Sequence, residues 1–263
     1  MNKNFEYTKK YLNYLEREFN THIVQLGVAT EAYNLNPKLV IDIGAHKGDW
    51  SAAMYYWLWP DAEYLLFEAD INREKDLEEK GFPYAICLLG SKLDKEETFY
   101  YEEKIGTGNG IYKENSNYFE LKSKSKTIKL NTLDNICKKN KISHIDILKL
   151  DVQGSELDIL KGSSNILKNT NIVVAECQLL EFNKGAAMFG EVIGWMDKHN
   201  FNVIDVAQFH RYDFTLKNGR KEKITSQMDM IFLKKDMMKP FTVSYDLNEN
   251  KEENEEEIEI KTI

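Results

Sequence analysis

The sequence is poor in cysteine and proline. Its three cysteines, Cys87, Cys137 and Cys177, form no Cys-x-x-Cys pair, and no metal-ligand spacing of Cys and His occurs. An odd, scattered set of cysteines excludes a disulfide framework and is typical of a reducing compartment. Because there are only 4 prolines and no Gly/Ser-rich linker among the 263 residues, we expect one domain with additions at its ends.

Long hydrophobic runs are also absent. No run reaches the roughly 18 apolar residues that a membrane-spanning helix needs. The first residues, MNKNFEYTKKYLNYLE, lack the apolar core of a secretory signal. These absences predict a protein with no membrane span and a cytoplasmic location.

Positive charge is scarcer than negative charge, since 35 Lys and Arg stand against 43 Asp and Glu, a net charge of −8. The one basic stretch, at 122–129, is short. Binding to nucleic acid needs clustered Lys and Arg, so nucleic acid is not an expected partner. Part of the acid excess lies in the run ENKEENEEEIE at 249–259, which is too polar to fold alone and predicts a solubilising or partner-ordered tail.

Short apolar runs alternate with helical stretches along most of the chain. Strands are expected over 39–44, 64–69, 84–89, 144–152, 171–177, 201–209 and 227–235, with helices over 48–58, 72–80, 155–162 and 186–199 and one or two more within 5–34. This alternation is typical of an α/β fold with a mostly parallel sheet and helices on both faces. Such sheets bind ligands at the carboxyl ends of their strands.

The first two predicted strand ends carry a nucleoside-binding pattern. The first ends in DIGAHKG, in which Gly44 and Gly48 let the backbone turn tightly and approach a ligand. The second ends at Glu68, 24 residues after Gly44. A carboxylate there suits the two hydroxyls of a ribose. A tight turn and a solvated acid explain either feature alone, but the combination is more specific.

His46 favours one cofactor over another. A dinucleotide fold uses Gly-x-Gly-x-x-Gly, whose second glycine makes room for a pyrophosphate. Here that position is His46, whose imidazole fits a pyrophosphate poorly. We therefore expect S-adenosylmethionine, a nucleoside without phosphates. A nicotinamide oxidoreductase is the alternative that His46 opposes.

The run LKLDVQGSELDILKG at 148–162 follows the fourth predicted strand. Ser155 and Glu156 suit a helix start, as cap and first-turn acid. A capped turn does not explain Lys149 and Asp151, because ionisable side chains near a buried strand end need partners. Asp151 is expected beside the reactive end of the cofactor.

Taken in order, VIDIGAHKGDWS, LLFEAD, LNTLDNIC, ILKLDVQGSELDILKG and MDMIFLKK resemble the motifs of the FkbM family of S-adenosylmethionine-dependent methyltransferases. The resemblance runs from about residue 37 to 235. It implies a class I methyltransferase fold, Rossmann-like, with a seven-stranded sheet whose last strand is antiparallel. It divides the chain into N-terminal helices at 1–36, a methyltransferase domain at 37–236 with an insertion at about 92–131, and an acidic tail at 237–263.

The resemblance also implies roles for residues. Asp42 and the loop Gly44, Ala45, His46 and Gly48 would hold the methionine part of the cofactor. Glu68 and Ala69 would lie at the ribose, and Leu89, Gly90 and Ser91 would line the adenine. Two positions depart from the family pattern, because Ala69 replaces the usual proline and Gln153 replaces the usual acid of Asp-Val-Glu-Gly.

The expected reaction is methyl transfer to a hydroxyl of a sugar or glycan, with catalytic residues Asp151, Lys149 and Glu176. A hydroxyl has a high pKa, so a base must take its proton during attack. Asp151 is the candidate base or orienting acid, and Lys149 would hold its charge. The leading expectation is that no metal takes part. The alternative is Mg²⁺ held by Asp151, Glu176 and Gln178.

Other side chains are candidates for acceptor recognition. His210 follows the sixth strand and could face the acceptor, whereas His199 near a helix end suits a surface or capping role. In the insertion, GTGNG at 106–110 is flanked by aromatic residues: Tyr100, Tyr101, Tyr112, Tyr118 and Phe119. These suit stacking on sugar rings or filling the core face of a hairpin. Alternatives to a sugar methyltransferase are methylation of a small natural product or a nitrogen, and an inactive scaffold. The sequence does not indicate an oligomeric state.

Overall fold

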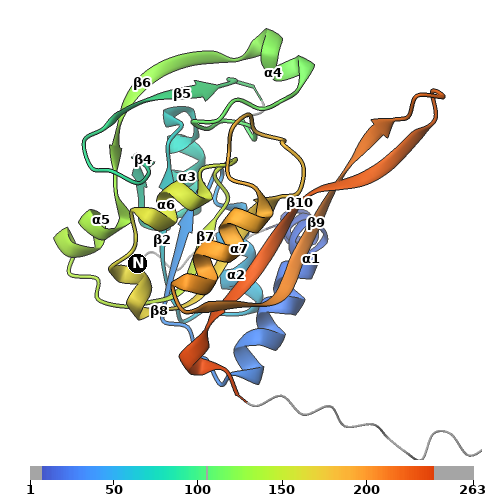
Figure 1. Cartoon of the computed structure of the whole chain (residues 1–263). Helices are drawn as coiled ribbons and strands as arrows, with labels where there is room; N and C mark the ends of the chain where they lie inside the picture. The colour runs from blue at the N-terminus through green and yellow to red at the C-terminus, as the bar shows by residue number, and fades with distance from the viewer. Residues whose placement is uncertain (1–7, 105, 240–263) are drawn as a thin grey trace, which may run out of the picture.

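The computed structural model describes residues 8–104 and 106–239, and the predicted acidic run at 249–259 lies outside them. Its main sheet has seven strands in the order β3-β2-β1-β7-β8-β10-β9 (Figure 1). The strands are β1 (Leu39–Ile43), β2 (Glu63–Glu68), β3 (Tyr84–Ile86), β7 (Ile145–Leu150), β8 (Thr170–Gln178), β9 (Phe201–Thr215) and β10 (Lys221–Lys234). Only β10, the last, runs antiparallel to both of its neighbours. This confirms the predicted fold class.

Helices cover both faces of the sheet. They are α1 (Lys9–Ala32), α2 (Asp49–Trp57), α3 (Glu74–Lys80), α5 (Leu133–Lys139), α6 (Glu156–Lys161) and α7 (Phe189–Lys198). One core packs α1 and α2 against residues such as Val40 and Ile147. The other packs α5, α6 and α7 against their neighbours Ile41 and Leu148. Because successive side chains of a strand point to opposite faces, the mostly apolar strands β1 and β7 supply residues to both cores.

The register of the sheet brings the strand ends to one edge. Ile43 is paired with Phe67 on one side and with Leu150 on the other, and Leu150 is paired with Ala175. The residues that follow these four are Gly44, Glu68, Asp151 and Glu176. The ends of the first, second, fourth and fifth predicted strands therefore lie side by side in one row. Glu176 pairs in turn with Asp229, so the row extends to β10.

Residues 96–131 form a separate layer beside this edge. β5 (Glu96–Tyr101) pairs antiparallel with β6 (Lys124–Asn131), and α4 (Asn117–Lys122) lies between them in sequence. A short strand, β4 (Leu88–Leu89), joins β6 to complete a three-stranded sheet. The hairpin predicted here is therefore present. Figure 1 shows this layer in green above the carboxyl ends of the main strands.

Two predicted elements differ from the structure. The single strand expected over 84–89 is divided, because β3 pairs with β2 whereas β4 pairs with β6. At the break, the backbone N–H of Cys87 donates to the carbonyl oxygen of Glu68. The last two strands are longer than expected and extend as a hairpin away from the sheet (Figure 1). Residues 211–215 of β9 are exposed, although Tyr212 and Phe214 alternate with polar residues in the pattern of a strand.

The first helix is a single element with an irregularity at Phe19, within the range predicted for one or two helices. Over the part of the chain that is described, no helix combines the length and hydropathy required to span a membrane.

Candidate active site

A cavity of about 650 Å³ opens at the carboxyl edge of the sheet. Its walls come from the loops after β1, β2, β7 and β8, from β9 and β10, from α1 and from the layer at 96–131. Among the residues proposed from the sequence, the cavity is lined by Gly44, Ala45, His46, Glu68, Ala69, Leu89, Lys149, Asp151, Glu176 and His210. Asp42, Gly48, Gly90 and Ser91 do not line it.

The glycine turn after β1 is required first by packing inside the protein. Gly44 has φ 78°, and a Cβ on it would lie 1.9 Å from the carbonyl oxygen of Asp151. Only a residue without a side chain fits where this turn crosses the end of β7. Two residues on, His46 adopts φ 49°, a left-handed conformation that is uncommon for residues other than glycine. The turn thus presents backbone to the cavity at a position where a ligand can approach it closely.

Glu68 is held in place by the backbone around it. One carboxylate oxygen accepts a hydrogen bond from the N–H of His46 at 2.8 Å, and the other accepts from Ala69 and Asp70 at 2.8 Å each. Burial raises the pKa of Glu68, and these three hydrogen bonds act in the opposite direction. The carboxylate therefore joins the loops after β1 and β2 and faces the cavity in a fixed orientation.

Asp42 lies behind the cavity wall. It is fully buried, accepts a hydrogen bond from the Ser51 hydroxyl at 2.7 Å, and lies 3.4 Å from Nζ of Lys149. Its predicted contact with the methionine part of a cofactor stays a prediction, and in this arrangement Asp42 would act through Lys149.

Of the residues predicted to line the adenine, Gly90 packs against the end of α6. A Cβ on Gly162 would lie 2.1 Å from the carbonyl oxygen of Gly90. Leu89 is the member of the predicted adenine set that reaches the cavity.

Lys149 joins two carboxylates. Its Nζ lies 3.4 Å from Asp42 and 3.2 Å from Asp151. Burial lowers the pKa of Lys149, but the charges of Asp151, Asp42 and Asp229 outweigh burial and raise it above its ordinary value. The ammonium group therefore keeps its proton and acts as a fixed positive charge. It neutralises the buried Asp42 and pairs with Asp151, whose side chain is 41% exposed toward the cavity.

Gln153, the position that departs from the family pattern, bridges two acids. Its Nε2 donates to Asp151 at 3.1 Å and to Oε2 of Glu176 at 3.2 Å. A carboxylate in its place would add a third acid between these two.

At the start of α6, the hydroxyl of Ser155 donates to the carbonyl oxygen of Val152 and makes no side-chain cap bond to the helix. Ser155 therefore occupies the predicted N-cap position and Glu156 the predicted first turn of α6, but the Ser155 hydroxyl does not cap the helix.

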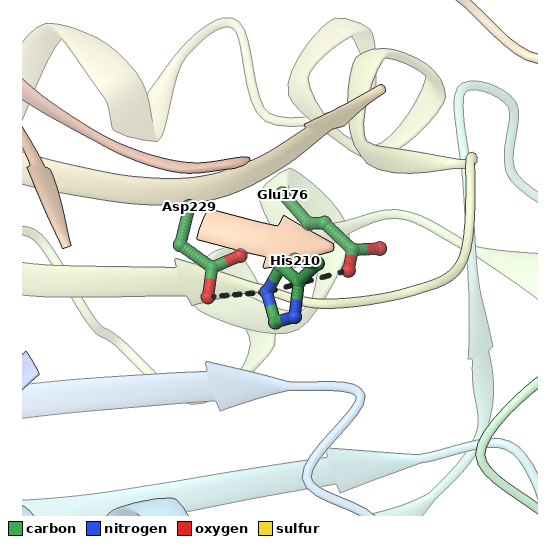
Figure 2. A group of neighbouring side chains, drawn as sticks. All are labelled: Glu176, His210 and Asp229. Carbon is green, nitrogen blue, oxygen red and sulfur yellow. Dashed lines mark hydrogen bonds and ion pairs between the residues drawn. The ribbon is translucent and has the colours of Figure 1, made fainter. Parts of the chain in front are cut away.

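Glu176, His210 and Asp229 converge on one point from three adjacent strands (Figure 2). Nε2 of His210 lies 3.1 Å from Oδ2 of Asp229 and 3.9 Å from Oε1 of Glu176. Burial raises the pKa of Glu176, and the charges of Asp151 and Asp229 raise it further. For Asp229, burial raises the pKa, but hydrogen bonds from His210 and His22 lower it well below its ordinary value.

Asp229 and His22 are site residues that the sequence analysis did not single out. His22, on α1, donates from Nε2 to Asp229 at 2.9 Å, and its Nδ1 accepts from the indole N–H of Trp50 at 3.3 Å. One signal could have found Asp229, since a lone acid within the apolar run MDMIF needs a partner in a buried strand. His22 had no such signal, because its partner is 207 residues away.

The insertion contributes some of its predicted aromatic residues to the cavity. Tyr118 and Phe119 line it, together with the backbone at 106–110. Tyr100, Tyr101 and Tyr112 do not line it, and Tyr112 donates instead to Asp158 at 2.8 Å. Two aromatic rings from elsewhere, Phe182 and Tyr212, pack 4.9 Å apart and also line it.

Two further side chains lie away from the cavity. The side-chain oxygen of Gln178 accepts from the N–H of Asn183, and its amide donates to the carbonyl oxygen of Ala187. This removes one ligand from the magnesium set considered above. His199 ends α7, where its ring stacks on Trp195, as expected for a capping residue.

Comparison with known proteins agrees with the fold. Residues 42–203 match the model of the methyltransferase FkbM domain. No curated protein matches the sequence. Among similar solved structures, methyltransferase FkbM from Methylobacillus flagellatus KT is 12% identical, covers 75% of this chain and 43% of its own, and has a TM-score of 0.43. An S-adenosylmethionine-dependent methyltransferase from Clostridium acetobutylicum ATCC 824 is 10% identical over 82% of this chain and 91% of its own, with a TM-score of 0.44.

The N-terminal domain of EvdMO1, whose structure holds SAH, is 7% identical over 81% of this chain and 79% of its own, with a TM-score of 0.40. The assignment does not rest on these structural likenesses. The family match carries the assignment, because it spans more than half of the chain, from Asp42 in β1 to Val203 in β9. The chain belongs to the FkbM methyltransferase family.

Proposed function

We propose that the protein transfers a methyl group from S-adenosylmethionine to a hydroxyl of a sugar or glycan. The observation that carries this proposal is the row of acids beyond the glycine turn: Asp151, Glu176 and Asp229 lie in one cavity with aromatic rings nearby. Carboxylates accept hydrogen bonds from hydroxyl groups, and aromatic faces suit the apolar faces of sugar rings. A polar acceptor that carries several hydroxyls fits this wall better than an apolar one.

The cofactor half of the cavity has the features that the cofactor needs. The turn at Gly44 exposes backbone, the Glu68 carboxylate is fixed by three backbone N–H groups, and Leu89 offers an apolar side. In the proposed arrangement Glu68 binds the ribose hydroxyls, and Leu89 contacts the adenine. When bound, S-adenosylmethionine supplies the methyl electrophile. A sulfonium cation also suits a site whose carboxylates outnumber its one buried lysine.

The protein's own part in the reaction is to orient the acceptor and take its proton. Asp151 is the proposed base, because its carboxylate faces the cavity next to the glycine turn. Lys149 cannot act as a base while it keeps its proton, so its role is to hold Asp151 in place. Glu176 extends the acidic wall toward His210 and Asp229, and we call these three residues with Phe182 and Tyr212 the acceptor end of the cavity.

A panel of acceptors tests the proposal. Purified protein is incubated with S-adenosylmethionine labelled in the methyl group and with mono- and oligosaccharides, phenols, amines and amino acids. We expect label in a sugar, with NMR locating the new methyl on oxygen, and no label when Asp151→Asn replaces the wild type. Transfer only to amines, or to phenols in preference to sugars, would contradict the proposal.

A further inference from the structure

The acceptor end of the cavity contains a group of side chains that the proposed reaction does not fully use. Glu176, His210 and Asp229 each offer one nitrogen or oxygen atom, and these atoms lie within 4.8 Å of one another (Figure 2). They are presented by β8, β9 and β10, so a packed sheet holds them together. One imidazole nitrogen and two carboxylate oxygens form a ligand set that suits divalent transition metals.

Glu176 has an oxygen whose partner the protein does not supply. The residue is 7% exposed. Its Oε2 accepts from Gln153 at 3.2 Å. Among the described residues, Oε1 accepts no hydrogen bond, and its ion-pair contact with Nε2 of His210 spans 3.9 Å, which is too long for a hydrogen bond. Glu176 lines the cavity, so a cation bound there would pair with this oxygen.

The other ligand atoms are oriented from behind, as in many metal sites. Oδ2 of Asp229 accepts from His22, which is itself positioned by Trp50. In the described part of the protein, Oδ1 of Asp229 accepts no hydrogen bond and is left for another partner. Gln153 fixes the remaining oxygen of Glu176 in the same way. Hydrogen bonds to the outer atoms of ligands commonly set the orientation of metal-binding side chains.

We propose that Glu176, His210 and Asp229 bind one divalent transition-metal ion at the acceptor end of the cavity. Without the ion, Nε2 of His210 donates a hydrogen bond to Oδ2 of Asp229 at 3.1 Å. The ion would replace that proton, which is released to solvent when the metal binds. A nitrogen ligand favours Mn²⁺, Fe²⁺, Co²⁺ or Zn²⁺ over Mg²⁺ and Ca²⁺, which prefer oxygen ligands alone. The set differs from the magnesium set considered in the sequence analysis, because Gln178 faces away and His210 and Asp229 take part.

The role of this ion rests on the proposed function. Any carboxylate is a weak base for a sugar hydroxyl, because the pKa of the hydroxyl is high. An ion that binds the acceptor oxygen directly lowers the pKa of that hydroxyl. The proton then passes from the acceptor oxygen to Asp151 as the oxygen–methyl bond forms and the sulfur–methyl bond breaks.

Binding of Mn²⁺ tests the site without any need for activity. Full-length protein is treated with chelator, desalted and titrated with MnCl₂, and free Mn²⁺ is followed by electron paramagnetic resonance. We expect one saturable site per chain, displaced by Zn²⁺ and not by an equal concentration of Mg²⁺. Glu176→Gln and His210→Ala should each weaken binding at least tenfold, and His199→Ala, which alters an exposed histidine of α7, should leave it unchanged. Thermal melts establish that each variant is folded.

The outcomes separate this proposal from the proposed function. Saturable binding that depends on His210 and Glu176 supports the metal site, even if no sugar is methylated. Absence of saturable Mn²⁺ and Zn²⁺ binding by the folded wild type would overturn it, as would unchanged binding in folded His210→Ala. Methyl transfer to a sugar that persists after chelation, without such binding, would also refute the metal site and leave the proposed function standing.

Discussion

Replacement of Gly44, in the turn after β1, should destabilise the protein more than the same replacement of Gly185. Gly44 and Gly185 both have φ 78°, so an alanine at either position meets the same backbone penalty of about 1–2 kcal/mol. They differ in their surroundings. A Cβ at Gly44 would lie 1.9 Å from the carbonyl oxygen of Asp151, whereas a Cβ at Gly185 meets nothing within 4 Å. The difference between the two variants therefore measures how tightly the turn packs on the end of β7.

The overlap at Gly44 cannot be relieved by a side-chain rotation, because the atom it meets is backbone. Forcing extra volume into a packed site costs about 1–3 kcal/mol. We expect Gly44→Ala to lower the free energy of unfolding by about 2–5 kcal/mol, the sum of the two terms. Gly185→Ala should lose only about 1–2 kcal/mol.

Urea denaturation followed by circular dichroism, with thermal melts as a second method, measures both values. Calorimetric titration with S-adenosylmethionine then shows whether Gly44→Ala, where it folds, has also lost the cofactor site. Equal destabilisation of the two variants would show that the turn does not press on Asp151, and the argument that this glycine is required by packing would fail.

Three more predictions concern the acids and the lysine of the site. Burial raises the pKa of Glu156 from 4.5 to about 7, so its contribution to stability is fully present below pH 4.5 and is lost as the pH rises through 7. Denaturation at pH 5 and pH 8 should therefore show a loss of up to about 3 kcal/mol that is smaller in Glu156→Gln; identical losses would contradict the assignment. Asp151→Asn should keep cofactor affinity within a few fold by calorimetry while abolishing turnover, and a normal rate would remove Asp151 from the chemistry. Lys149→Met should destabilise the protein by about 3–5 kcal/mol because it leaves the buried Asp42 without its cation, and the double variant with Asp42→Asn should recover much of that loss in the same assay.

Much of the fold could be predicted from the sequence because its strands are buried on both faces. The runs that became β1, β7 and β8 are mostly apolar, and the predicted ends of these strands agree with the structure to within a few residues. The parallel pairing then brought Gly44, Glu68 and Asp151 to one edge, as the position of ligand sites in such sheets predicts. These positions follow from the apolar pattern of each strand and from the rule that parallel sheets bind ligands at the carboxyl ends of their strands.

The rest of the site depends on contacts between distant parts of the chain. The link between His22 on α1 and Asp229 on β10 arises only when a helix and the last strand meet. The break between β3 and β4 is set by a second partner strand, β6, and the apolar run at 84–89 has no glycine or proline to mark it. The ion pair between Asp42 and Lys149 follows from the pairing of β1 with β7, which the sequence alone does not show.

The central claim is that the carboxyl edge of the sheet binds S-adenosylmethionine through Glu68. Calorimetric titration of the wild type with S-adenosylmethionine and, separately, with NADH tests it most directly. Glu68→Ala is the test variant, and Glu63→Ala, at the exposed start of the same strand, is its control. We expect the protein to bind S-adenosylmethionine and not NADH, with affinity weakened at least tenfold by Glu68→Ala and unchanged by Glu63→Ala. Binding of NADH, or equal affinity of the two variants for S-adenosylmethionine, would contradict it.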